Sequence, residues 1–360
     1  MKSFFCALLV LPLFLLGVSA GAEGEIDVST VEDALPEPAR EVSGQLITDG
    51  SYDLSGALER LFLRGKALLT ETIRAEWRSL AALMALALLY GVCAAFAQER
   101  GAGEFLSMAV CAGAVLLTEE SVTGLMTQTA ETLTSLTDYS RAALPTVFTA
   151  SVLSGAVSSA PAKYAAVFLG LDVMSSVTRA LTLPLIYAYT AMSASLSFFE
   201  SPVLRWTANS VKWLTVTLMS FLTLAACSYV SLTGAIAASA DAAAVKAART
   251  AISSVFPVVG GILSDTAGML LSSAGILRSS LGVFALIGIA ALCLGPFAAL
   301  SVKMVGFKAV SACASALGGG RLPGLLGDLG TAMGLLLALV GSQSIFLFLS
   351  LTAAMKAVSG

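Results

Sequence analysis

The sequence predicts an all-α fold: a polytopic bundle of transmembrane helices, preceded by a signal peptide and a short extracytoplasmic lead. Of its 360 residues, 57% are hydrophobic and 12% are charged, whereas roughly a quarter are charged in a soluble domain. The mean hydropathy is +0.89. Several apolar stretches also approach the length of about 20 residues that a helix needs to cross a bilayer.

The N-terminus has the three parts of a secretory signal peptide. Lys2 supplies a positive charge, residues 4–18 form an apolar run, and Val18-Ser19-Ala20 offers small residues for cleavage. We therefore predict a signal peptide at residues 1–20, removed after Ala20. An uncleaved anchor helix is the alternative, but the apolar run is short for a span.

The next segment, residues 21–53, is predicted to be an acidic, disordered, extracytoplasmic lead. It has one basic residue, Arg40, and nine acidic residues: Glu23, Glu25, Asp27, Glu32, Asp33, Glu37, Glu41, Asp49 and Asp53. A segment with so much charge and so few apolar residues cannot bury enough surface to order itself.

Residues 54–78 are predicted to form an amphipathic helix that leads into the membrane. Apolar residues recur at spacings of three and four, among them Leu54, Leu61 and Trp77. Two interpretations are open. The helix packs on its own bundle or lies in the membrane interface, or it offers a docking surface to a partner.

Residues 79–360 are predicted to be a polytopic membrane domain of seven to eight spans. Eight stretches meet or approach the required length: 79–97, 105–126, 142–160, 164–180, 181–199, 211–237, 280–302 and 331–354. Glu119 and Glu120 interrupt the second stretch, so the prediction is a range of seven to eight spans. The fourth contains Asp172 and Arg179.

The signal peptide predicts an extracytoplasmic N-terminus, so the first span runs inward. Basic residues favour cytoplasmic connections, and eight spans would place most of them there: Lys163, Arg205, Lys212, Lys303, Lys308 and Arg321. Lys246, Arg249 and Arg278 would lie outside. The C-terminus would be extracytoplasmic with eight spans and cytoplasmic with seven.

The composition argues against an enzyme. The chain has no histidine, which is the usual general base near neutral pH and the commonest metal ligand. The cysteines lie in or beside apolar stretches without metal-binding spacing, as packing residues do: Cys6, Cys93, Cys111, Cys227, Cys293 and Cys313. Basic residues are scattered singly, unlike those of a nucleic-acid surface. We predict no catalytic, cofactor or metal site and no nucleic-acid partner.

Two charged residues inside an apolar stretch, Asp172 and Arg179, are the first candidate functional residues. In a continuous helix they lie about two turns apart on one face. Ionisable groups at membrane depth are costly unless paired or hydrated, which marks them as functional candidates. Equally open is that Arg179 extends to the headgroups and Asp172 pairs with a base on another helix.

A second candidate is a break in residues 251–275, which we predict to be a re-entrant segment. Pro257, Gly260 and Gly261 interrupt an apolar stretch just before Asp265. Non-helical backbone at membrane depth persists only where protein or a water-filled cavity covers it. A loop on the outer surface is the alternative.

Three runs carry a resemblance to a known family: KAAR at 246–249, FPVVGGILSD at 256–265 and GILRSSLGV at 275–283. Together they resemble the characteristic stretch of the stage III sporulation protein AE family. The resemblance extends more loosely from about residue 139 to the C-terminus. It implies a signal peptide, a short lead and a polytopic membrane body.

The resemblance also implies a function, a location and partners. It implies a membrane component of a multiprotein channel, similar to secretion machinery, that links mother cell and forespore during endospore formation. The location would be the mother-cell membrane around the forespore. Its partners would be other stage III sporulation membrane proteins, a cytoplasmic ATPase and a forespore-side protein. A secondary transporter of a small solute and a structural scaffold are the alternatives.

Overall fold

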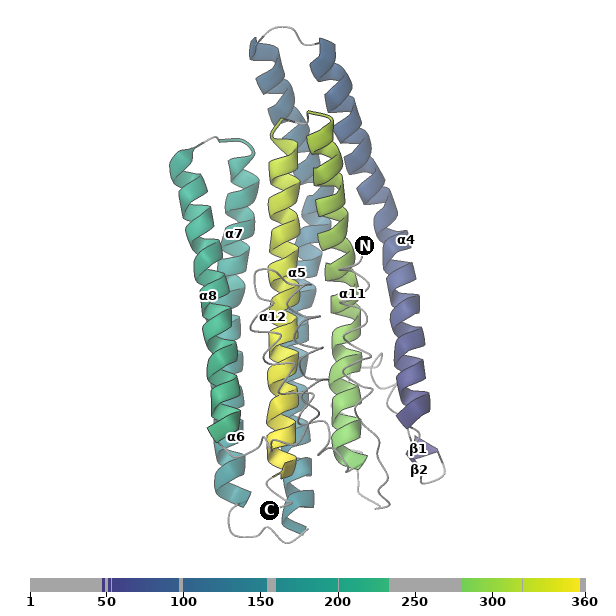
Figure 1. Cartoon of the computed structure of the whole chain (residues 1–360), viewed down its shortest axis with the longest axis vertical. Helices are drawn as coiled ribbons and strands as arrows, with labels where there is room; N and C mark the ends of the chain where they lie inside the picture. The colour runs from purple at the N-terminus through teal and green to yellow at the C-terminus, as the bar shows by residue number, and fades with distance from the viewer. Residues whose placement is uncertain are drawn as a thin grey trace, which may run out of the picture.

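The computed structural model describes an elongated bundle of long helices. The described residues are 47–48, 51–52, 54–96, 100–153, 160–199, 201–232, 280–318 and 320–356. The helices run nearly along the long axis of the molecule, so that α4 begins and α12 ends at the same end (Figure 1).

Helices make up almost all of the described chain. A strand pair comes first, β1 (Ile47–Thr48) and β2 (Ser51–Tyr52), which is antiparallel and falls at the end of the predicted lead. The helical elements that follow are α4 (Leu54–Phe96), α5 (Arg100–Leu153), α6 (Ala160–Val177), the π-helix η2 (Thr178–Thr182), α7 (Leu183–Leu196), α8 (Pro202–Leu232), α11 (Ser280–Ala316) and α12 (Leu322–Lys356).

Five helical segments in the described residues are long and apolar enough to cross a membrane: Arg60–Ala94, Gly103–Pro145, Phe168–Leu196, Ile287–Ala316 and Leu322–Leu351. The prediction of a helical integral membrane protein is therefore supported. Helix α8, which overlaps the predicted span 211–237, is not among the five. The signal peptide at 1–20 lies outside the described residues, and the count of seven to eight spans is not confirmed.

Several predicted boundaries are absent from the structure. The amphipathic segment 54–78 and the span 79–97 form one helix, α4. The spans 105–126 and 142–160 lie largely within α5, which continues unbroken through the polar stretch between them. Threonines in that stretch stay helical because their hydroxyls donate to carbonyls four residues back, as Thr129 does to Leu125 and Thr137 to Leu133.

The unbroken α5 changes the side of the membrane on which Lys163 is expected to lie. Because α5 runs the length of the bundle, α6 begins at the end where α4 begins (Figure 1). In the predicted orientation that end is extracytoplasmic. The position of Lys163, near the start of α6, therefore falls there and not in a cytoplasmic connection.

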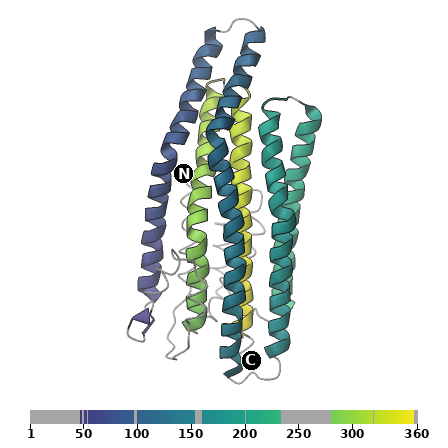
Figure 2. The same cartoon turned by 180° about the vertical axis from the view of Figure 1, so that it is seen from behind.

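Helices α11 and α12 form a hairpin at the centre of the bundle. Figure 2, seen from behind, shows α5 in front of this hairpin, with α4 to one side and the α6–α7 run with α8 to the other. Most of the inner side chains of α12 are apolar, including Leu326, Leu336 and Leu347, which are fully buried. The central helix is thus held chiefly by close apolar packing.

The turn between α11 and α12 is fixed by a glycine in the left-handed region. Gly320 has a φ of +56°, and a Cβ there would lie 2.5 Å from Tyr90 Oη and 2.7 Å from Ser107 Oγ. The next residue, Arg321, donates from Nη1 to Phe198 O (3.0 Å) and from Nη2 to Glu104 Oε1 (2.8 Å). One turn thereby joins α4, α5 and the end of α7.

Helix α4 packs on α11 through small residues and one buried ion pair. Lys303 on α11 is completely buried and pairs with Glu76 on α4. Ser121 on α5 donates to Glu76 Oε1 at 3.3 Å. At Gly306, one turn from the lysine, a Cβ would lie 2.6 Å from Leu80 Cδ2, so the two helices meet closely there.

The outer faces carry large apolar side chains. Trp206 and Trp213 on α8 are 72% and 68% exposed, and Phe105 on α5 and Trp77 on α4 are similarly exposed. Such surfaces are rare on monomeric soluble proteins and are expected where lipid surrounds the helices.

Candidate functional site

A line of polar side chains follows the inner face of the α6–η2–α7 run. Its members recur every three or four residues, with a gap filled by the buried Ile186: Ser175, Thr178, Thr182, Tyr189, Ser193 and Ser197. Each is 5% exposed or less. This spacing places them on one helical face. We call these six residues the polar stripe.

The π turn in the middle of the stripe has a local cause in the sequence. Pro184, just after the turn, has no N–H, and its ring collides with the carbonyl four residues earlier in a regular α-helix. A single wider turn relieves this conflict. In the structure the N–H of Leu183 donates to Thr178 O, a five-residue step.

The π turn leaves one hydroxyl without a partner. Other buried threonines donate to the carbonyl four residues back: Thr118, Thr129, Thr137, Thr190, Thr215 and Thr223. For Thr182 that carbonyl belongs to Thr178 and accepts the N–H of Leu183 instead. Thr182 Oγ1 is fully buried and makes no hydrogen bond with the described residues. Such a group costs about 1–3 kcal/mol.

Two hydrogen bonds join the stripe to α12. Near one end, Gln343 Nε2 donates to Ser175 Oγ at 2.8 Å, and both side chains are buried. Nearer the other end, Tyr189 Oη donates to Asp328 Oδ1 at 3.2 Å. The interface of the stripe with the facing sides of α8 and α12 is called the polar seam below.

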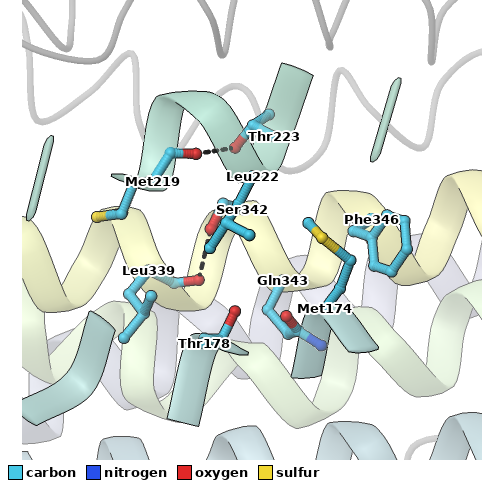
Figure 3. A pocket seen from close by; sticks show the side chains of 9 residues that line it. All are labelled: Met174, Thr178, Met219, Leu222, Thr223, Leu339, Ser342, Gln343 and Phe346. Carbon is cyan, nitrogen blue, oxygen red and sulfur yellow. Dashed lines mark hydrogen bonds between the residues drawn. The ribbon is translucent and has the colours of Figure 1, made fainter. Parts of the chain in front are cut away.

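A small cavity opens in the polar seam beside the π turn. Figure 3 shows the lining side chains, which come from α6, η2, α8 and α12: Met174, Thr178, Met219, Leu222, Thr223, Leu339, Ser342, Gln343 and Phe346. Its volume is about 10 Å³, close to the minimum for one water molecule.

The polar atoms at the cavity differ in how they are satisfied. Thr223 Oγ1 donates to Met219 O and Ser342 Oγ to Leu339 O, both within their own helices (Figure 3). Gln343 Nε2 donates to another helix, to Ser175 Oγ, and Thr178 adds a hydroxyl to the lining. Thus a water molecule would have a donor or acceptor on each of two sides.

The predicted pair Asp172 and Arg179 is not brought together. Asp172 lies 2.5 Å from Arg141 Nη2 on α5, and Arg141 also lies 3.9 Å from Asp138. Arg179 donates from Nε to Ser175 O in its own run at 3.4 Å. The alternative of pairing with a base on another helix is therefore the one the structure shows for Asp172. Neither residue lines the cavity.

The other candidates lie outside the described residues. Pro257, Gly260, Gly261 and Asp265 all fall between α8 and α11, as does the predicted re-entrant segment 251–275. In the part of the chain that the structure describes, no three side chains of His, Cys, Asp or Glu gather closely enough to hold a metal ion.

Sequence reasoning missed the polar seam, although a signal for it exists. The stripe is visible as polar residues at helical spacing inside an apolar stretch. The predicted boundary between 180 and 181 divided it between two spans and hid the repeat.

Comparison with known proteins gives one family. The family model for stage III sporulation protein AE matches residues 44–358, nearly the whole chain. No curated protein matches the chain, and no solved structure does.

Proposed function

Because the chain belongs to the stage III sporulation protein AE family, we propose that it is a membrane component of a channel or export apparatus linking mother cell and forespore. Membership of the family implies a role in stage III of sporulation, and the apolar helices make the chain an integral membrane protein. The channel itself is the proposal, and the family match over residues 44–358 is the observation that carries it.

The proposal includes a location and an orientation. The chain would lie in the mother-cell membrane around the forespore, with its N-terminus extracytoplasmic after removal of residues 1–20. The proposal also includes seven to eight membrane spans for the whole chain. Five candidate spans lie in the described residues and support it.

The proposed partners are other stage III sporulation membrane proteins, a cytoplasmic ATPase and a forespore-side protein. The ATPase would supply the energy, so that this chain would act without catalysis of its own. Family membership supports membership of a sporulation membrane complex. The individual partners follow from the proposed channel.

Deletion of the gene in its spore-forming host tests the proposal. Loss of heat-resistant spores is expected, together with loss of passage of a small tracer from mother cell to forespore. Normal tracer passage in the deletion strain would contradict the channel function. Loss of spores with normal tracer passage would indicate a role in sporulation other than that of a channel.

A paired variant separates the channel from a scaffold. Gly260→Leu with Gly261→Leu is expected to stop tracer passage while the chain still inserts and still co-purifies with its partners. If the partners are lost as well, the chain acts as a scaffold. Undiminished passage would instead favour a surface loop at residues 251–275.

A further inference from the structure

We propose that the polar seam is the route through this chain for water and small uncharged polar solutes, closed in this structure and opened in the assembled apparatus. The inference rests on the channel function proposed above and names the path within it. Its starting point is the pairing of a polar stripe with a water-sized cavity.

The length of the polar stripe suits a route across a membrane. From Ser175 to Ser197 the run rises about 33 Å at about 1.5 Å per residue, and the hydrocarbon core of a bilayer is about 30 Å thick. All six polar residues of the stripe are buried in the bundle, away from lipid. The stripe therefore spans a comparable depth, with one apolar interval at Ile186 between Thr182 and Tyr189.

Hydrogen bonding along the stripe is incomplete, as expected of a surface that water enters. Thr182 Oγ1 is buried without a partner among the described residues. Ser193 Oγ, also in the stripe, is likewise buried without a hydrogen-bond partner among the described residues. Groups that only hold helices together would be satisfied within the protein. Water at these positions removes the cost of leaving them unpaired.

The chemistry of the cavity indicates uncharged solutes. None of the residues lining it is charged, and the carboxylate of Asp328, which accepts from Tyr189 elsewhere in the seam, does not line it. Hydroxyl and amide groups can replace the hydrogen bonds that a small neutral solute makes with water. They do not offset the much larger cost of desolvating an ion.

The side chains that line the cavity in this closed structure are able to change conformation. At about 10 Å³ the cavity admits no solute larger than water, so passage requires α8 to separate from α12. Met174 and Met219 line the gap, and methionine side chains adapt readily to changed packing. The adjoining π turn is a feature often found at functional positions in helices.

Cysteine substitution tests the route. In a chain whose native cysteines are replaced, Thr182→Cys and Thr223→Cys are placed in the seam, with Thr129→Cys as the matched control. Thr129 is also a fully buried threonine, but it lies on α5. Each variant must first restore heat-resistant spores. A small water-soluble methanethiosulfonate is then applied to sporulating cells, and labelling and passage of a small neutral tracer are measured.

The two seam cysteines are expected to react at least tenfold faster than the control in the assembled apparatus, and their modification should block the tracer. Equal, slow reaction at all three positions overturns the proposed route. Reaction of the seam cysteines that does not block tracer passage overturns it as well. In either case, tracer passage that still requires the chain leaves the channel function intact. Passage that persists when the gene is deleted overturns the channel function itself and the route with it.

Discussion

The central hairpin of α11 and α12 meets its neighbours in two different ways. On one side, α4 is fixed to α11 by the buried Lys303–Glu76 pair and by contact of Leu80 with Gly306. On the other side, α12 meets the stripe at a cavity lined by neutral hydroxyl and amide groups, and through the Tyr189–Asp328 hydrogen bond away from that cavity. A buried charge pair tolerates little separation, whereas neutral groups can exchange partners with water. We infer a fixed side and a movable side.

The largest effect is expected from breaking the ion pair on the fixed side. Glu76→Leu leaves the ammonium of Lys303 buried without its partner, which should lower the free energy of unfolding by about 3–5 kcal/mol. Denaturant unfolding in detergent measures it. Adding Lys303→Met should recover most of the loss, since no buried charge remains. Glu71→Leu, at an exposed site on α4, is the control and should have little effect.

A smaller loss is expected from Gly306→Ala. The new Cβ would lie 2.6 Å from Leu80 Cδ2. Because the end of a flexible side chain can shift, the cost should lie near the lower end of the about 1–3 kcal/mol typical of overpacking. Gly295→Ala on the same helix has nothing within 4 Å of the new atom and should be neutral or stabilising. Equal stabilities of the two variants would show that α4 and α11 are not closely fixed.

A still smaller change, of opposite sign, is expected in the seam. Thr182→Val removes a buried hydroxyl without a partner and should leave the free energy of unfolding unchanged or raise it by about 1 kcal/mol. Thr129→Val removes a hydroxyl bonded to Leu125 O and should lower it by about 0.5–1.5 kcal/mol. A clear loss at Thr182 would mean that its hydroxyl has a binding partner in the folded protein.

The smallest effect is expected at Asp172 and Arg179, the charged residues first suggested by the sequence. Asp172 pairs instead with Arg141; these two side chains are 44% and 47% exposed, and exposed ion pairs contribute about 0–1 kcal/mol. Asp172→Asn with Arg179→Gln should therefore retain near-normal numbers of heat-resistant spores. A sporulation defect in cells where the variant still assembles would return these two residues to the list of functional candidates.

The helical membrane fold could be predicted because it depends on composition. Apolar stretches of sufficient length are read directly from the sequence, and α11 and α12 fall where two of them were predicted. Boundaries were less predictable. Charged residues such as Glu119 and Glu120 suggest a break in the span, but α5 continues through both of them, with their side chains exposed.

The seam could not be predicted in full because it depends on contacts between distant residues. The spacing of Ser175, Thr178 and Thr182 is visible in the sequence, but their burial, and the hydrogen bond of Ser175 with Gln343, are properties of the folded bundle. The loss of the Thr182 bond is likewise a consequence of the π turn. In contrast, Asp172 stands out in the sequence because it is a charged residue within an apolar stretch.

The central place of α12 has a consequence for biosynthesis. It is the last described helix in chain order, yet it packs against α5, α7, α8 and α11. Helices made earlier therefore lie in the bilayer without α12 until translation has passed residue 356. During that time lipid or an assembly factor covers their inner faces. During that interval the hydroxyls of α7 have no protein surface opposite them, which makes the nascent chain a natural client for an insertase.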